Sequence, residues 1–233
     1  GRAGHPAPAP TPRRSAMSFR DRTHAGRELA LRLAGRTGSG DPFDLLVLAL
    51  PPGGVPVAAE VARALQAPLD VLVAGEISTP VRPETTIGAL VADDPPLYDR
   101  NSLAMMHLSE DRLGDIVVTE RNALHRREYR YRGRRPLPSV EGRTVVLVDD
   151  GLTTGLTATA ALRFVHRHAP ARLVLAVPVG SPRTVRALRA ECDDLLCLVQ
   201  PPGLHAVGEW YEDFGAVPDE EVTGTLHAFR TPA

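Results

Sequence analysis

The sequence predicts an α/β fold in which a mostly parallel sheet is flanked by helices. Short, continuously apolar runs alternate with longer segments whose apolar residues recur at helical spacing, a pattern typical of parallel sheets covered by helices. The chain has 233 residues, of which 43% are hydrophobic. This is enough for one sizeable core with a small appendage, so we expect one main domain.

The first half of the chain begins with a segment that predicts no structure. Residues 1–16 are rich in Pro, Ala and Arg without an apolar period, so we expect a disordered extension. Met17 begins the ordered part, because Ala25, Leu29 and Leu33 fall at helical spacing. The elements expected next are a strand at 44–50, a helix at 55–66, a strand at 69–74, and a hairpin or flap from 86–91 and 97–98.

The second half repeats the alternation of strands and helices. Ser109 is expected to cap a long charged helix that ends at Arg132, before Pro136. The elements expected after it are strands at 144–148, 172–177 and 195–199, and helices at 156–168, 182–190 and 218–229.

Composition excludes several classes of function. The formal net charge is −1, so no overall field draws the chain to nucleic acid or to an acidic membrane. No apolar run approaches the roughly 20 residues of a membrane span. Cys192 and Cys197 have no histidine at ligand spacing and read as buried thiols. We therefore expect a cytoplasmic protein. Every basic side chain is an arginine, so a mechanism that needs a lysine is excluded.

One segment, Val145 to Thr157 (VVLVDDGLTTGLT), carries the candidate chemistry. An apolar strand delivers Asp149 and Asp150 to its carboxyl end, where ligand sites of parallel sheets lie. A loop with two glycines and three threonines then opens a helix, so N–H groups and hydroxyls converge at the positive end of the helix dipole. A ligand that places a phosphate on the loop and two neighbouring hydroxyls on the carboxylates would be a sugar phosphate. The alternative is an ordinary strand-to-helix turn capped by a threonine.

This run of four apolar residues, two acids, a variable pair and Thr-Thr-Gly-x-Thr resembles the phosphoribosyl pyrophosphate motif of the type I phosphoribosyltransferases. The resemblance implies the type I fold, a mostly parallel sheet with a small hood or flap. It implies one domain over 17–233, with flap or hood elements at about 76–135 and 200–233. The substrate-binding residues that it implies are Gly151, Thr153, Thr154, Gly155 and Thr157, with Gly53, Gly54, Trp210 and Tyr211.

The resemblance also implies an activity. A ribose 5-phosphate group would pass from phosphoribosyl pyrophosphate to a small nitrogenous acceptor, with a purine-like base as one candidate, and pyrophosphate would be released. Asp149 and Asp150 would be the catalytic residues, holding the ribose hydroxyls. Mg²⁺ would be the cofactor, touching these acids only indirectly through ribose hydroxyls or water. Neither a membrane nor a nucleic acid is an expected partner.

Two positions depart from the family's pattern. The loop after the first strand, Leu50 to Val55, should meet pyrophosphate, and Gly53 and Gly54 suit close approach. Pro52, however, offers no N–H where a bacterial subgroup that the chain resembles carries an arginine. After the second strand, Glu76 stands where a basic residue is expected. A binding or regulatory protein that lost catalysis is therefore the second hypothesis.

Two further segments have open interpretations. Arg121 to Arg135 has three interpretations: a flap that supplies guanidinium groups to pyrophosphate, a solvated helix face, or a nucleic-acid-binding stretch in which Tyr129 and Tyr131 interleave with arginines. The aromatic block Ala206 to Phe214 either stacks a base through Trp210 and Tyr211 or caps the core or a homodimer contact. The same subgroup also resembles this block and Phe19 to Arg22 near the start.

Overall fold

The computed structural model describes residues 18–37 and 44–230, so the extension predicted at 1–16 lies outside the described residues. Its centre is a five-stranded parallel sheet in the order β2-β1-β6-β7-β8. The strands are β1 (Leu45–Ala49), β2 (Leu69–Val71), β6 (Thr144–Val148), β7 (Arg172–Val179) and β8 (Asp194–Val199). The predicted α/β class with a mostly parallel sheet is confirmed.

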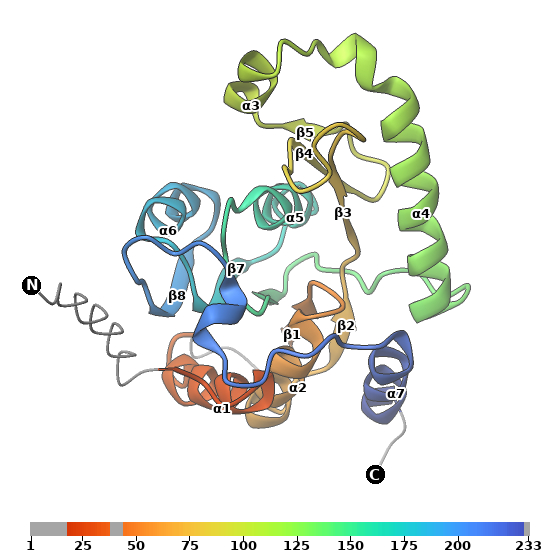
Figure 1. The fold of residues 1–233 in the computed structure, drawn as a ribbon. Coiled ribbons are helices and arrows are strands. Elements are labelled where there is room, and N and C mark those ends of the chain that lie inside the picture. The colour runs from red at the N-terminus through yellow and green to blue at the C-terminus, as the bar shows by residue number, and fades with distance from the viewer. Residues whose placement is uncertain (1–17, 38–43, 231–233) are drawn as a thin grey trace, which may run out of the picture.

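Both faces of this sheet are covered by helices, because alternate residues of each strand point to opposite sides. Val146 and Val148 face one layer, while Val145 and Leu147 face the other. The first layer holds α1 (Arg22–Leu33), α2 (Gly54–Leu65) and α7 (Asp219–Arg230); the second holds α5 (Leu156–His166) and α6 (Pro182–Leu188), which a 3-10 turn (Arg189–Glu191) follows. Figure 1 shows the sheet between these layers.

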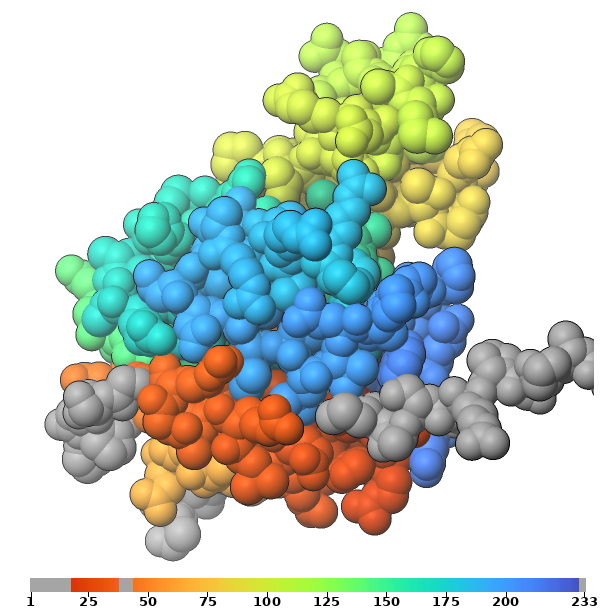
Figure 2. Space-filling view, turned by 90° about the vertical axis from the view of Figure 1, so that its left-hand side faces the viewer, coloured from red at the N-terminus to blue at the C-terminus, as the bar shows by residue number. Residues whose placement is uncertain are grey.

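A second unit stands apart from the five-stranded sheet, and we call residues 74–132 the flap. It contains an antiparallel sheet of β3 (Ala74–Ile77), β4 (Gly88–Val91) and β5 (Leu97–Tyr98). The long helix α4 (Gly114–Arg132) runs along it, preceded by α3 (Arg100–Met105) and a 3-10 turn (Glu110–Leu113). In Figures 1 and 2 the flap projects from the rest of the molecule. The predicted hairpin of 86–91 with 97–98 is present as β4 and β5.

Two predicted elements differ from the observed ones. The strand expected at 69–74 divides, because β2 ends at Val71 and the chain crosses to the flap sheet, where β3 begins at Ala74. The helix expected from Ser109 begins only at Gly114, since Ser109 makes no capping hydrogen bond with its side chain and a 3-10 turn comes first.

The two cysteines, expected from sequence to be buried thiols, both lie within the described residues. Cys192 and Cys197 are free and half-buried, and burial raises the pKa of Cys192 to about 11 and that of Cys197 to about 12. Across residues 18–37 and 44–230, no helix combines the length and apolar character needed to cross a membrane.

Segments from opposite ends of the described chain meet beside the parallel sheet. Phe19 pairs with Tyr211, and a 3-10 turn (Val207–Trp210) leads into this contact. Figures 1 and 2 show the segment before α7, in blue, lying along α1, in red. We call residues 19–22 together with 210–215 the brace. The Ala206 to Phe214 block and Phe19 to Arg22 are therefore spatial neighbours.

Candidate functional site

The predicted phosphate loop connects the carboxyl end of β6 to the start of α5. Gly155 precedes the helix with φ of 77°, a left-handed conformation that glycine adopts without strain. It has no side chain to cap α5, and the first turn of the helix contains no acid. Apart from the N–H of Leu156, which donates to the Thr154 hydroxyl over a long 3.5 Å, no described side chain caps this turn, and the helix dipole favours an anion there.

The loop is held in shape from behind by β7 and α6. The N–H of Leu152 donates to the carbonyl of Val179 at 2.9 Å, and the hydroxyl of Thr184 donates to the carbonyl of Thr153 at 2.6 Å. Thr153 and Thr154 keep exposed side chains. The Thr154 hydroxyl also accepts the first N–H of α5 over 3.5 Å. A fixed backbone with exposed hydroxyls is the arrangement expected of a preformed anion site.

The two acids have different surroundings. The Oδ1 atom of Asp149 accepts the backbone N–H of Asp150 at 2.8 Å. Burial, followed by the negative charge of Asp150, raises the pKa of Asp149 well above its ordinary value. Asp150 instead forms an ion pair, its Oδ2 atom lying 3.1 Å from Nε of Arg22.

The loop after β1 closes against these acids. A Cβ atom on Gly53 would lie 2.2 Å from Oδ2 of Asp150, so a side chain at this position would displace the carboxylate of Asp150. Gly54 approaches the carbonyl of Val148 in the same way, with 2.8 Å for its hypothetical Cβ. Gly53 and Gly54 therefore contact the acid pair from the side, as close neighbours of the predicted loop.

These elements surround a cavity of about 180 Å³ at the carboxyl end of β6. Seven of the predicted residues line it: Asp149, Asp150, Gly151, Thr153, Thr154, Gly155 and Thr157. Leu152 and Val207 complete the wall on the core side, and the flap contributes Glu76 and Thr86, whose side chains are 3.4 Å apart. Gly53, Gly54, Trp210 and Tyr211 are not among the residues that line the cavity.

The structure places the two predicted base-stacking aromatics behind the acid pair. Tyr211 is only 4% exposed, so its ring has no free face for a base. It packs against Phe19 and Phe214, with ring centroids 5.6 and 4.9 Å apart. Its hydroxyl donates to the carbonyl of Asp150 at 2.6 Å, and burial raises its pKa, which keeps it protonated. Trp210 is half-buried against the same cluster, as the core-capping alternative predicts.

The arginine-rich segment 121–135 serves mainly to attach α4. Arg121 donates to the carbonyls of Ala92 and Asp94 at 2.6 and 2.9 Å, and Arg127 to that of Ala74 at 2.6 Å. Arg130 pairs with acids of α7. None of these arginines lines the 180 Å³ cavity. With these partners, the segment is not a purely solvated helix face.

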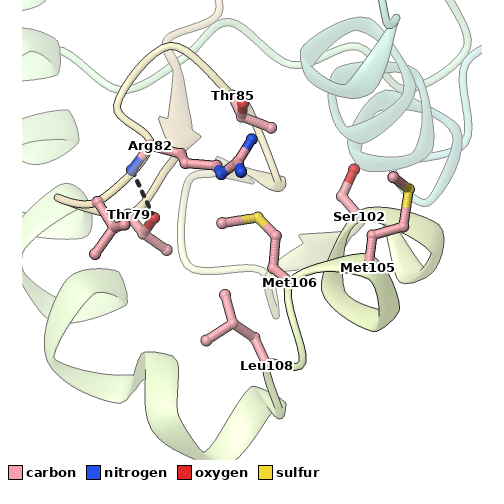
Figure 3. A pocket seen from close by; sticks show the side chains of 8 residues that line it. Thr79, Arg82, Thr85, Ser102, Met105, Met106 and Leu108 are labelled. Carbon is pink, nitrogen blue, oxygen red and sulfur yellow. Dashed lines mark hydrogen bonds between the residues drawn. The ribbon is translucent and has the colours of Figure 1, made fainter.

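A larger cavity, about 600 Å³, lies within the flap itself (Figure 3). Its wall is mostly apolar, and Figure 3 shows the guanidinium of Arg82 extending over it. The residues that line it are Thr79, Val81, Arg82, Thr85, Ser102, Met105, Met106 and Leu108. No predicted site residue belongs to this cavity.

Two residues at the site were missed from sequence. Arg22 comes from the start of α1 and reaches Asp150 across 128 positions of sequence. The available signal was the joint resemblance of Phe19 to Arg22 and of Ala206 to Phe214 to one bacterial subgroup, since these segments now form the brace. Glu76 was noticed only as a missing cation, whereas the structure places it in the cavity wall.

A parallel α/β sheet with an open helix N-terminus beside paired acids defines an α/β protein built to bind an anionic ligand. The model of the phosphoribosyl transferase domain matches residues 33–212. The chain therefore belongs to the phosphoribosyl transferase domain family and has the type I fold, as its motif predicts.

Relatives support this assignment. A protein of Mycobacterium tuberculosis H37Rv, named as a candidate phosphoribosyl transferase (Rv0571c), is 39% identical over 208 residues, which are 89% of this chain and 46% of that protein. The chain thus spans about half the length of the curated relatives it matches. The crystal structure of TT1426 from Thermus thermophilus is 40% identical with a TM-score of 0.74, over 91% of this chain and 99% of that one. The AQ2163 protein of Aquifex aeolicus, 13% identical with a TM-score of 0.50, over 89% of this chain and 85% of that one, shares the fold alone.

Proposed function

We propose that this chain binds the ribose 5-phosphate moiety of phosphoribosyl pyrophosphate and transfers it to a nitrogen nucleophile with release of pyrophosphate. The observation that carries the proposal is the 180 Å³ cavity, in which the threonine loop and the acid pair share one wall. The N–H groups at the start of α5 and the hydroxyls of Thr153, Thr154 and Thr157 would hold the 5-phosphate. Asp149 and Asp150 would accept hydrogen bonds from the ribose hydroxyls.

The reaction that this placement supports is a displacement at the anomeric carbon. The bond from that carbon to the pyrophosphate oxygen breaks, and its electron pair leaves with pyrophosphate. The lone pair of the acceptor nitrogen forms the new bond, and the nitrogen then loses its proton. Positive charge develops on the ribose ring in the transition state. The carboxylates of Asp149 and Asp150, on the side of the ribose hydroxyls, would stabilise that positive charge.

Mg²⁺ fits this site only indirectly. Among residues 18–37 and 44–230, no group of three or more acids, histidines or cysteines is arranged to hold a metal ion. Oδ1 of Asp149 is engaged by the N–H of Asp150, and Oδ2 of Asp150 by Arg22. We therefore propose that Asp149 and Asp150 would hold Mg²⁺ through ribose hydroxyls or water. When bound, the ion would supply charge neutralisation of pyrophosphate.

The part of the cavity wall that the flap contributes affects which acceptors the site would favour. Glu76 places a third carboxylate on the cavity, and no arginine lies in the wall to balance it. Such a wall disfavours an acceptor that carries a carboxylate and favours a nitrogen with hydrogens to donate. We therefore propose a neutral or cationic nitrogen acceptor, a class that includes purine-like bases, with Glu76 as the group that accepts its proton.

The second candidate is a protein that binds the sugar phosphate without turnover. Pro52 offers no N–H in the loop beside the acids, and the cavity wall contains no cation for pyrophosphate. Each missing charge-assisted hydrogen bond forfeits about 1.5 to 3 kcal/mol. Loss of two such bonds would slow departure of pyrophosphate by several orders of magnitude and leave binding of the ribose 5-phosphate part intact.

One experiment separates the two candidates. The purified protein is incubated with phosphoribosyl pyrophosphate, Mg²⁺ and a panel of nitrogen acceptors, and release of pyrophosphate is followed. Thermal shift with the same ligand is measured in parallel. Release with any acceptor supports the transferase, whereas a thermal shift without release supports the binding protein.

The matched variants test the site itself. Asp149→Asn combined with Asp150→Asn should abolish both signals, because an amide oxygen is a weaker acceptor than a carboxylate for ribose hydroxyls. Asp111→Asn, at an exposed acid of the flap, should leave both unchanged. A ligand-induced shift that survives the double substitution would refute the assignment of the acid pair.

A further inference from the structure

Arg22 makes three contacts that converge behind the acid pair. Its Nε atom lies 3.1 Å from Oδ2 of Asp150, and its NH1 group donates to the carbonyl of Gly215 at 2.6 Å. Its guanidinium carbon lies 3.9 Å above the ring of Phe214, a cation–π distance. Only 12% of the Arg22 side chain is exposed. The guanidinium is therefore held from three directions.

The brace fixes the backbone that carries Arg22. The N–H of Phe19 donates to the carbonyl of Trp210 at 2.9 Å, and the carbonyl of Phe19 accepts the N–H of Glu212 at 2.8 Å. Asp21 caps α1 by accepting the N–H of His24 at 2.8 Å, which sets the direction in which the first helical residue, Arg22, leaves the backbone. The position of this guanidinium is thus defined before any ligand binds.

Asp150 is restrained at both its backbone and its side chain. Its carbonyl accepts the hydroxyl of Tyr211, and its Oδ2 atom faces Arg22 and packs against Gly53. With Oδ2 engaged in this way, the orientation of the carboxylate is set in the cavity that Asp150 lines. A carboxylate that can rotate would lose much of this directional preference.

We propose that Arg22 is a positioning residue for the sugar site, holding the carboxylate of Asp150 in the orientation that meets a ribose hydroxyl. This inference rests on the proposed function, because it presupposes that ribose occupies the cavity. Arg22 would act through Asp150 and would not touch the sugar. A largely buried ion pair contributes little net stability, because removing both charges from water offsets their attraction. Orientation of a ligand-binding group is a use that this pairing serves directly.

The test compares two ligands that differ only in the part that Asp150 would contact. Ribose 5-phosphate offers phosphate and hydroxyls, while inorganic phosphate offers phosphate alone. Affinities for both are measured by calorimetry, with thermal unfolding, for wild type, Arg22→Gln, Arg22→Lys and Arg20→Gln. Arg20 is the matched control, since it is exposed and joins the brace through its backbone.

Arg22→Gln should weaken ribose 5-phosphate binding about tenfold or more, since the hydroxyl contact loses its fixed partner. Binding of inorganic phosphate should stay within about twofold, because the threonine loop is untouched. Arg22→Lys should recover part of the loss, since an ammonium keeps the charge but not the fork. Arg20→Gln should behave as wild type.

The outcomes distinguish this inference from the function beneath it. Wild-type protein that binds neither ligand refutes the proposed function and the inference with it. Wild-type protein that prefers ribose 5-phosphate, with Arg22→Gln showing the same preference or losing both ligands equally, refutes the inference alone. Should Arg22→Gln fail to fold, Phe214→Leu removes the ring face under the guanidinium and keeps an apolar side chain, and it should show the same selective loss at smaller size.

Discussion

Asp149 and Asp150 are adjacent in sequence, yet their carboxyl groups face opposite electrostatic conditions. Arg22 balances the charge of Asp150, whereas burial and the charge of Asp150 oppose ionisation of Asp149. A carboxylate that must ionise in such surroundings lowers the stability of the free protein. The chain therefore trades some stability for an acid that we propose binds the ribose, as is common at functional sites.

This trade predicts that Asp149→Asn stabilises the protein. Because the folded-state pKa of Asp149 is raised, its stability contribution is complete below the unfolded-state pKa and is lost as pH rises through the folded-state value. At neutral pH the amide should raise Tm by a few degrees, and the gap should close on acidification. An equal or lower Tm for Asp149→Asn at neutral pH would contradict this. Asp111→Asn is the control for a general charge effect.

Glu76 carries a second prediction at the scale of one residue. Glu76→Gln should lower kcat/KM for the nitrogen acceptor about 100-fold, the order of effect of removing a general base. Affinity for phosphoribosyl pyrophosphate should be unchanged or tighter, because a negative charge leaves the cavity wall. Steady-state kinetics in both substrates provide the measurement. Glu84→Gln, at an exposed acid in the connection between β3 and β4, is the control. Parallel loss in both substrates would assign Glu76 to general structure.

The acids and threonines of the site were predictable because they are consecutive along one strand, loop and helix. Seven of the predicted residues line one cavity, as the motif predicts. The roles of Arg22 in the brace and of Glu76 in the cavity wall were not predictable, because these residues come from α1 and from the flap, far from the motif in sequence. Tyr211 was misleading for a related reason. Its aromatic ring could stack on a base, but the ring is buried against Phe19 and Phe214.

At the scale of elements, the start of α5 is the most demanding piece of backbone. Gly155→Ala should lower the free energy of unfolding by about 2 kcal/mol, because alanine is strained at φ of 77° and its Cβ would lie 2.6 Å from Thr184. Gly224 lies inside α7, and no described heavy atom is within 4 Å of the Cβ that alanine would add. Gly224→Ala should therefore raise the free energy of unfolding by about 0.5 to 1 kcal/mol. Urea unfolding of both variants checks the opposite signs. A neutral Gly155→Ala would show that this turn can relax.

Element prediction succeeded where one local pattern governed the outcome. The strand at 144–148 was predicted at its observed bounds, since a continuous apolar run buried on both faces has few alternatives. The segment 69–74 is also apolar apart from Asp70, yet it divides between two sheets. Hydropathy does not record which sheet a residue joins. The start of the helix predicted at Ser109 was set instead by a preceding 3-10 turn.

At the scale of the molecule, Arg132 joins the flap to the parallel sheet. This buried guanidinium donates from α4 to the carbonyl of Val71 at 2.7 Å and pairs with Glu128 at 3.1 Å. It therefore secures the point at which the chain leaves β2 for the flap. The flap in turn carries Glu76 and Thr86 to the cavity, so its attachment bears on both stability and the site.

Arg132→Ala should lower the free energy of unfolding by about 2 to 4 kcal/mol, because a buried carbonyl and a half-buried carboxylate lose their charged partner. Arg126→Ala, at an exposed position of the same helix, should change it by less than about 0.5 kcal/mol. Chemical denaturation reports both. Equal effects of the two substitutions would mean that α4 is held by other contacts.

The brace also joins parts of the chain that are synthesised at different times. Arg22 and Asp150 are translated before Phe214 and Gly215, whose ring and carbonyl contact the guanidinium. Two of the three contacts of Arg22 therefore depend on a segment that follows β8, the last strand of the parallel sheet.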